Sequence, residues 1–338
     1  MKDRFREIIE KFLSPLDELE YPIRDSIYFL RKDGCFVFSH GYYHPTPGQF
    51  IGKIIYYPDP RGSVDIWGRQ YEAMHKAWVD GVHVAIPNDV QVQKHYRIDP
   101  SLDPSHPRPL VADFTIEFPL KDFVGFFPPR KSLRLSMEMY PQVKRWTQAT
   151  GELLDFPGEK LGATGSLAYG KIEEQDMDFD VIFRGTLEEN RRVLDRIYRL
   201  AEEPARQVFE FGKLWPMRIY HLDYLLCPFF VYQDHQQAPL CQAEVELIES
   251  NVEGRASVAD DTHNAYLPIY LGLEEVEIEG KNYPRLDFIC YDGSIRGEYR
   301  RGDRIHFKGR LLKIITPSRG EFPALTVDIS FDLTKIEG

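Results

Sequence analysis

The sequence predicts an α+β protein of several domains, on three observations. The chain has 338 residues, enough for two or three domains. Residues 26–129 and 242–338 are rich in short apolar runs separated by turn residues, which is typical of β-strands. Between them, residues 131–156 have helical texture. We therefore expect a β-rich N-terminal domain at 1–130, an α/β domain at 131–236 and a small β-barrel at 237–338.

Composition and charge narrow the classes of function. Hydrophobic residues make up 43% and charged residues 28%, which is typical of a globular protein. The net charge of −11 argues against general binding of polyanions, so any contact with nucleic acid needs a local basic patch. The four scattered cysteines form no CxxC pair, which disfavours a zinc site or a disulfide framework. With no apolar signal sequence and no apolar run of roughly 20 residues, we expect a cytoplasmic protein without membrane contact. The sequence leaves its oligomeric state open.

The N-terminal domain has clear local signals. Apolar spacing at residues 4–13 predicts a short amphipathic helix. Asp33-Gly34 lies between two apolar runs and predicts a β-hairpin. The other elements expected here are a strand at 50–57, a short helix at 71–78 and a loop at 99–109.

The stretch 161–183 carries the strongest chemical pattern. An apolar run ends at Gly165-Ser166, which predicts a strand followed by a tight turn. Asp178 and Asp180 open the next strand and, being two residues apart, project from the same face. Such a carboxylate pair needs a cation or a proton between its members. Asp176 shares the same parity, so the pair could instead be Asp176 and Asp178.

The segment after this pair continues the α/β pattern. Thr186 and Glu189 form a capping box, and the helix that they begin is bounded by Pro204. Residues 217–230 predict one long strand with Asp223 on an inner face beside His221. A carboxylate inside an apolar strand needs a partner, which is either a metal site or a backbone N–H or arginine. His221 either lines that site or is a core histidine.

The residues Gly165-Ser166, a spacer of eleven residues, and Asp178-Phe179-Asp180 resemble the signature of the nucleotidyltransferase superfamily related to DNA polymerase β. This superfamily includes poly(A) polymerases, CCA-adding enzymes, aminoglycoside adenylyltransferases and small antitoxin-type enzymes. The chain departs from it at Leu167, where many members have Arg, and at Met177, where they often have Ser or Thr. The resemblance covers residues 158–230 and leaves the substrate subfamily open.

The resemblance implies a polymerase-β-like α/β domain and a defined chemistry. Asp178, Asp180 and Asp223 would hold two Mg²⁺ ions and act in catalysis, and Gly165 and Ser166 would bind the phosphates of a nucleoside triphosphate (NTP). The enzyme would transfer a nucleoside monophosphate from an NTP to a hydroxyl of RNA, protein or a small molecule, with release of pyrophosphate.

Two other functions remain open. A catalytically silent module would keep the fold and bind a nucleotide or RNA. Absence of Asp223 from the cleft, or blockage of the Gly165-Ser166 turn, would favour this alternative. A purely structural partner-binding protein would not bring Asp178, Asp180 and Asp223 to one point.

Strand-like runs alternate with turns in the C-terminal domain, a pattern typical of a small barrel of the OB type. The pattern is clearest at residues 303–314. A basic run with interleaved aromatic residues predicts either a surface for single-stranded nucleic acid or a solvated barrel face. The residues of this surface are Arg300, Arg301, Arg304, Lys308 and Arg310.

His40 and His44 lie in the sequence SHGYYHP of the N-terminal domain. Two histidines at this spacing suggest a metal site. The neighbouring Tyr42, Tyr43 and Pro45 instead favour a loop with aromatic packing.

Overall fold

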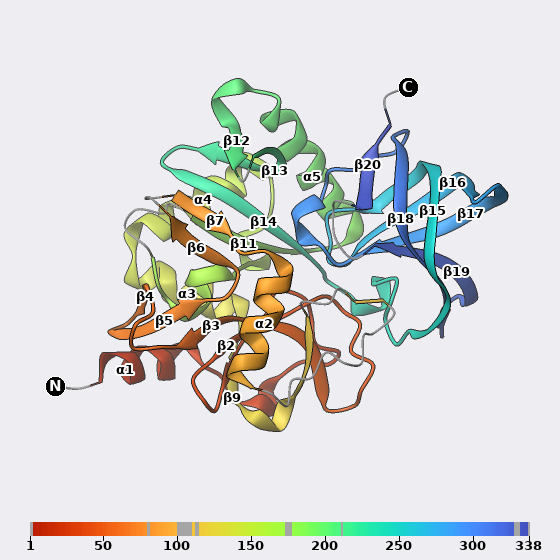
Figure 1. Ribbon diagram of the computed structural model, residues 1–338. Coiled ribbons are helices and arrows are strands. Elements are labelled where there is room, and N and C mark those ends of the chain that lie inside the picture. The colour runs from red at the N-terminus through yellow and green to blue at the C-terminus, as the bar shows by residue number, and fades with distance from the viewer. Residues whose placement is uncertain are drawn as a thin grey trace.

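The computed structural model describes residues 3–79, 82–99, 110–111, 115–172, 178–210, 212–327 and 332–336. Within these residues the chain is an α+β protein with three main sheets and one two-stranded ribbon. In Figure 1 the N-terminal unit (red to orange) and the C-terminal unit (blue) lie on either side of the central sheet. None of the helices in these ranges is long and apolar enough to cross a membrane.

The N-terminal unit is built on one antiparallel sheet, whose strands lie in the order β4-β5-β3-β2-β1-β9. Strand β8 also pairs with β3. The expected hairpin is confirmed, since Tyr28 pairs with Phe38 across a turn in which Gly34 has a φ of +91°. The helix expected at 4–13 is also confirmed. The elements are α1 (Arg4–Phe12), β1 (Tyr28–Arg31), β2 (Phe36–Ser39), β3 (Gln49–Pro58), β4 (Val64–Ile66), β5 (Arg69–Ala73), β8 (Ile116–Pro119) and β9 (Phe123–Phe127).

The helix expected at 71–78 is wrong. Those residues fall in β5 and in β6 (Lys76–Val79), which pairs with β7 (Val82–Ala85). Tyr71 and Ala73, two residues apart on the strand, are both buried because β5 pairs with β3. This pairing overrides the local helical pattern. Helix α2 (Asn88–Ile98) follows, and the expected loop lies outside the described residues except for Asp99.

The central unit holds a five-stranded sheet with the order β10-β11-β14-β13-β12. Strand β11 runs parallel to β14, whereas β10 is antiparallel to β11. The capping box predicted at Thr186 and Glu189 is confirmed at the start of α5. The elements are α3 (Pro129–Met139), α4 (Pro141–Leu154), β10 (Leu161–Ala163), β11 (Asp178–Gly185), α5 (Leu187–Ala201), β12 (Gln207–Glu210), β13 (Lys213–His221) and β14 (Tyr224–Tyr232).

The two faces of this sheet differ in character. Phe179, Val181 and Phe183 are buried in the core that α4 and α5 complete. Asp178 and Asp180 alternate with these residues along β11, so they project from the opposite face. That second face is the one that lies toward Tyr28 and Tyr56 of the N-terminal sheet.

The C-terminal unit is a sheet whose strand pairing returns to its starting strand. Its strands pair in the order β15-β16-β17-β19-β18, and β18 pairs again with β15. The contact between β17 and β19 is parallel and the others are antiparallel. The strands are β15 (Glu244–His263), β16 (Ile269–Ile278), β17 (Lys281–Cys290), β18 (Arg304–Thr316), β19 (Gly320–Val327) and β20 (Leu333–Lys335).

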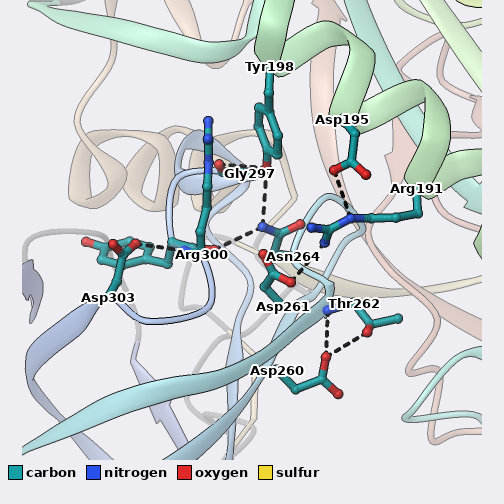
Figure 2. Close-up of polar contacts among 11 residues, drawn as sticks. Arg191, Asp195, Tyr198, Asp260, Asp261, Thr262, Asn264, Gly297, Arg300 and Asp303 are labelled. Carbon is teal, nitrogen blue, oxygen red and sulfur yellow. Dashed lines mark hydrogen bonds and ion pairs between the residues drawn. The ribbon is translucent and has the colours of Figure 1, made fainter.

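The units are joined through buried contacts. Tyr169 of the central unit lies in the core of the N-terminal sheet. Tyr266 of the C-terminal unit stacks on Tyr232 of β14, with ring centroids 4.0 Å apart. Figure 2 shows helix α5 bonded to the C-terminal unit, where the Tyr198 hydroxyl donates to the Gly297 carbonyl at 2.9 Å. The three units therefore share cores, and the exact domain boundaries stay a prediction.

Candidate functional site

The candidate site lies where the turn after β10 meets the start of β11. Strand β10 pairs with β11, and the Thr164 N–H donates to the Asp180 carbonyl at 3.1 Å. Gly165 then takes a φ of +58°, and a Cβ added to it would lie 1.9 Å from Oδ2 of Asp180. Only glycine combines this backbone conformation with so close an approach of a carboxylate. The turn and the carboxylate therefore form one structural feature.

A cavity of about 90 Å³ opens at this contact. It is lined by Gly165, Ser166, Asp178 and Asp180, all of them partly exposed. Its volume exceeds the roughly 10–15 Å³ that one water needs, so it has room for a metal ion and phosphate oxygens. The structure thus brings together four of the five residues predicted for the catalytic and phosphate-binding site.

Sequence reasoning missed the residues that complete this cavity. They come from the N-terminal unit and from the turn itself, and no local pattern links them to Asp178 or Asp180. Tyr28 is buried, and this burial, followed by the nearby Tyr56 and Asp180, raises its pKa well above the usual value. The added lining residues are Tyr28, Tyr56, His75, Lys76, Leu167, Lys171 and Ile172.

The expected position of Asp223 is wrong. The predicted strand at 217–230 is a hairpin, in which β13 and β14 pair His221 with Tyr224 across the two-residue turn Leu222-Asp223. Leu222 has a φ of +52° and its side chain is 69% exposed. Asp223 is therefore a turn residue, and the alternation that placed it on an inner strand face stops at His221.

The carboxylate of Asp223 also reaches the other side of the sheet. It accepts from Nε1 of Trp146 at 3.0 Å and forms an ion pair with Arg145 of α4. Trp146 packs against Phe179, whose ring projects from the face opposite to Asp178 and Asp180. The structure thus does not bring Asp223 to the carboxylate pair.

His221 lies at the same hairpin and is partly exposed. Its Nδ1 lies 3.1 Å from Nη1 of Arg206, which donates to it. Burial, followed by the charge of Arg206, lowers the pKa of the ring. His221 is therefore a bonded hairpin residue and not part of the cavity lining.

The carboxylate pair suits one divalent cation. Asp178 and Asp180 offer the oxygen ligands that Mg²⁺ prefers, beside a turn that leaves space for phosphate oxygens. Within the described ranges, no three His, Cys, Asp or Glu side chains are grouped closely enough to hold a metal ion. The expected two-ion arrangement through Asp223 has no support in this geometry. Asp176, the alternative partner of Asp178, lies outside the described residues.

The two histidines of the N-terminal loop bond to the backbone. Nε2 of His40 donates to the Tyr291 carbonyl at 2.9 Å, and Nε2 of His44 donates to the Ile23 carbonyl at 3.1 Å. Nδ1 of His44 accepts from the Ile51 N–H at 3.0 Å. Burial lowers the pKa of His40 to about 3 and that of His44 to about 4. These bonds hold the loop in place and occupy both ring nitrogens of His44 and Nε2 of His40.

The predicted nucleic-acid surface carries acidic partners. Lys308 lies 3.4 Å from Glu253, which also lies 2.9 Å from Nε2 of His306. The guanidinium of Arg300 lies 3.6 Å from the ring centroid of Tyr198 on α5. Mixed charge weakens the attraction of this face for a polyanion. A role for Arg300, Arg301, Arg304, Lys308 and Arg310 in binding nucleic acid stays a prediction.

Comparisons of the chain with protein-family models, with curated proteins and with solved structures find no match.

Proposed function

We propose that the cavity binds the triphosphate of a Mg²⁺-bound NTP and that the protein is a nucleotidyltransferase of the type its motif resembles. The contact between Gly165 and Asp180 carries this proposal. In this contact, a glycine turn that would bind phosphate lies directly beside a carboxylate that would bind the metal. The turn and the carboxylate pair are separated in the sequence, so their meeting at one cavity is a stronger indication of a nucleotide site than either feature alone.

Each residue of the cavity has a role in this proposal. Asp178 and Asp180 would hold the cation, and the Gly165 and Ser166 turn would bind the β- and γ-phosphates through its N–H groups and hydroxyl. Bound Mg²⁺ would neutralise phosphate charge and orient the triphosphate. The nucleoside would lie beside the triphosphate, where His75 and Lys76 also line the cavity.

The transfer itself is a displacement at the α-phosphorus. The acceptor's hydroxyl oxygen forms a bond to that phosphorus, the bond to the bridging oxygen breaks, and pyrophosphate leaves. The proton of the hydroxyl passes to water, since Asp223 lies on the other face of the sheet. The acceptor would be RNA, protein or a small molecule.

The surrounding fold supports this proposal. The order β10, turn, β11, α5 is the strand, turn, strand and helix order expected of a polymerase-β-like core. The pairing of the C-terminal strands, with β18 returning to β15 and β17 parallel to β19, supports a small OB-like barrel beside it.

The placement of Asp223 favours a second candidate. A nucleotidyltransferase of two-metal type needs a third carboxylate near the pair, and here that carboxylate bonds to Trp146 and Arg145. A module that binds the nucleotide without transferring it needs only the cavity. Both candidates therefore share the binding step and differ in the release of pyrophosphate.

Thermal unfolding with and without Mg²⁺ and each NTP tests the binding step. A ligand that binds only the folded state adds about 2.7 kcal/mol at a hundredfold excess over its dissociation constant. We expect a Mg²⁺-dependent rise in melting temperature with the wild type and none with Asp178→Asn/Asp180→Asn. No rise with any nucleotide would overturn both candidates. Given binding, release of pyrophosphate in the presence of an acceptor separates the transferase from the silent module.

A further inference from the structure

Arg218 lies on the same face of the central sheet as Asp178 and Asp180. Asp180 pairs with Cys227 of β14. Ile219 of β13 pairs with Leu226, so the preceding Arg218 lies opposite Cys227, in the same row of paired residues across the sheet as Asp180. Directly paired strand residues share a face. Burial opposes the charge of Arg218, but Cys227, Glu210, Asp180 and Asp178 together raise its pKa. Arg218 thus brings a permanent positive charge to the row of Asp180.

The side chain of Arg218 is fixed from its far side. Its guanidinium lies 4.4 Å from the ring centroid of Trp215 and donates from Nη1 to Oε2 of Glu210 at 2.5 Å. The side chain remains 24% exposed, so it is not sealed from solvent.

A second arginine reaches this face from the C-terminal unit. The guanidinium of Arg296 lies 4.5 Å from the ring centroid of Phe229, which pairs with Ile182 and shares the face of Cys227. Burial, the largest effect, lowers its pKa, and its titratable neighbours are Asp25, Arg218, Cys227 and Asp180. Arg296 remains partly exposed.

The loop that carries Arg296 is anchored on both sides. The Gly297 carbonyl accepts from Tyr198 of α5, as Figure 2 shows, and the Gly297 N–H donates to the Asn264 carbonyl at 3.0 Å. Nζ of Lys213 on β13 donates to the Ser294 carbonyl at 2.6 Å. These bonds fix the loop against α5 and β13, and so hold Arg296 over the sheet.

We propose that Arg218 and Arg296 form an anion subsite beside the carboxylate pair, which binds the polyphosphate of the nucleotide. This inference rests on the proposed function, because the subsite would act on a phosphate chain that a cation at Asp178 and Asp180 also holds. The planar guanidinium matches phosphate oxygens in a bidentate geometry.

The two arginines have opposite effects on the two ligands. Positive charge near Asp178 and Asp180 weakens the binding of a cation alone, because the two like charges repel each other. The same charge strengthens the binding of a polyphosphate once the cation is in place. Removing one arginine should therefore tighten the binding of metal and weaken the binding of polyphosphate. A role confined to folding would not produce these opposite signs.

Titration calorimetry with Mn²⁺ alone, then with inorganic tripolyphosphate at saturating Mn²⁺, tests this inference. For Arg218→Gln and for Arg296→Gln we expect a severalfold higher affinity for Mn²⁺ and an affinity for tripolyphosphate about tenfold lower. Arg218→Lys and Arg296→Lys keep the charge and should keep the wild-type affinity for Mn²⁺. Arg255→Gln is the matched control, because Arg255 bonds to Glu277 on the C-terminal sheet. It should leave both affinities unchanged.

The outcomes separate this inference from the proposed function. Wild type that binds neither Mn²⁺ nor tripolyphosphate overturns the proposed function and this inference with it. If the wild type binds both Mn²⁺ and tripolyphosphate, Gln variants that bind like the wild type overturn the arginine subsite alone. Gln variants that lose affinity for both ligands do the same. Melting curves identify a variant that fails to fold. If Arg218→Gln does not fold, the Arg296→Gln, Arg218→Lys and Arg296→Lys proteins test the inference.

Discussion

Oδ2 of Asp180 lies 1.9 Å from the position that a Cβ at residue 165 would occupy. The glycine turn and the carboxylate are thus in mutual contact, although β10 and β11 are joined by a long connection. The approach depends on two properties of glycine, the absence of a side chain and the freedom to adopt a φ of +58°.

We expect Gly165→Ala to abolish the stabilisation by Mg²⁺ and nucleotide. The methyl group would displace the Asp180 carboxylate or unwind the turn, and both changes separate the cation ligand from the phosphate-binding turn. Strain at a positive φ and overpacking together should lower the free energy of unfolding by about 2–6 kcal/mol. Urea unfolding and nucleotide-dependent melting measure the two effects.

Gly158→Ala is the matched control for this change. Gly158 has no heavy atom within 4 Å of an added Cβ and no positive φ, so both stability and nucleotide binding should stay at the wild-type level. A Gly165→Ala protein that binds nucleotide like the wild type would contradict the role of this contact.

We expect Asp223→Asn to leave Mg²⁺-dependent nucleotide binding intact, in contrast to Asp178→Asn/Asp180→Asn. Asp223 is about half exposed and bonds to Arg145 and Trp146 of α4, so losing its charge should cost less than about 1 kcal/mol of stability. Melting curves with and without Mg²⁺ and nucleotide measure both quantities. Loss of nucleotide binding in Asp223→Asn would place this carboxylate at the cavity after all.

Acid should destabilise the protein through His40. Its pKa is about 6.5 when unfolded and about 3 when folded, because burial disfavours the imidazolium. The stabilisation by the neutral ring is complete above pH 6.5 and is lost as the pH falls toward 3. At pH 5 the loss is about 2 kcal/mol. Urea unfolding between pH 5 and 7 should give a shallower pH dependence for His40→Asn than for the wild type, and equal slopes would contradict this assignment.

Gly297→Ala should weaken the anchoring of the loop that carries Arg296. An added Cβ would lie 2.4 Å from Sδ of Met217, so Met217 or the loop must move. Gly302→Ala separates the clash from the strain of a positive φ, since Gly302 has a φ of +93° but no heavy atom within 4 Å of an added Cβ. We expect Gly297→Ala to lose about 1–2 kcal/mol more stability than Gly302→Ala, measured by urea unfolding. Equal losses would mean that the loop accommodates the methyl group freely.

Local features of the fold could be predicted from the sequence. The hairpin at Gly34 and the capping box at Thr186 are set by a few neighbouring residues, and the structure has them where the sequence places them. Residues 71–78 were predicted as a helix, but pairing of β5 with β3 decides their structure. That pairing depends on residues far away in the chain.

The candidate site divides in the same way. Alternation along one strand was enough to place Asp178 and Asp180 on one face, because the period of two is a property of the strand itself. Asp223 could not be placed, since apolar residues continue through the turn at Leu222 and hide the end of β13.

Local sequence patterns set the chemistry of the candidate site: a glycine turn, a pair of carboxylates at strand spacing, and the helices and strands around them. The surroundings of that chemistry depend on tertiary packing. It sends Asp223 to the helical face, and it brings Tyr28 and Arg296 to the face of the pair from either end of the chain. The physical reason is that backbone geometry acts over a few residues, whereas the packing of three units on one sheet depends on contacts between segments that the sequence keeps far apart.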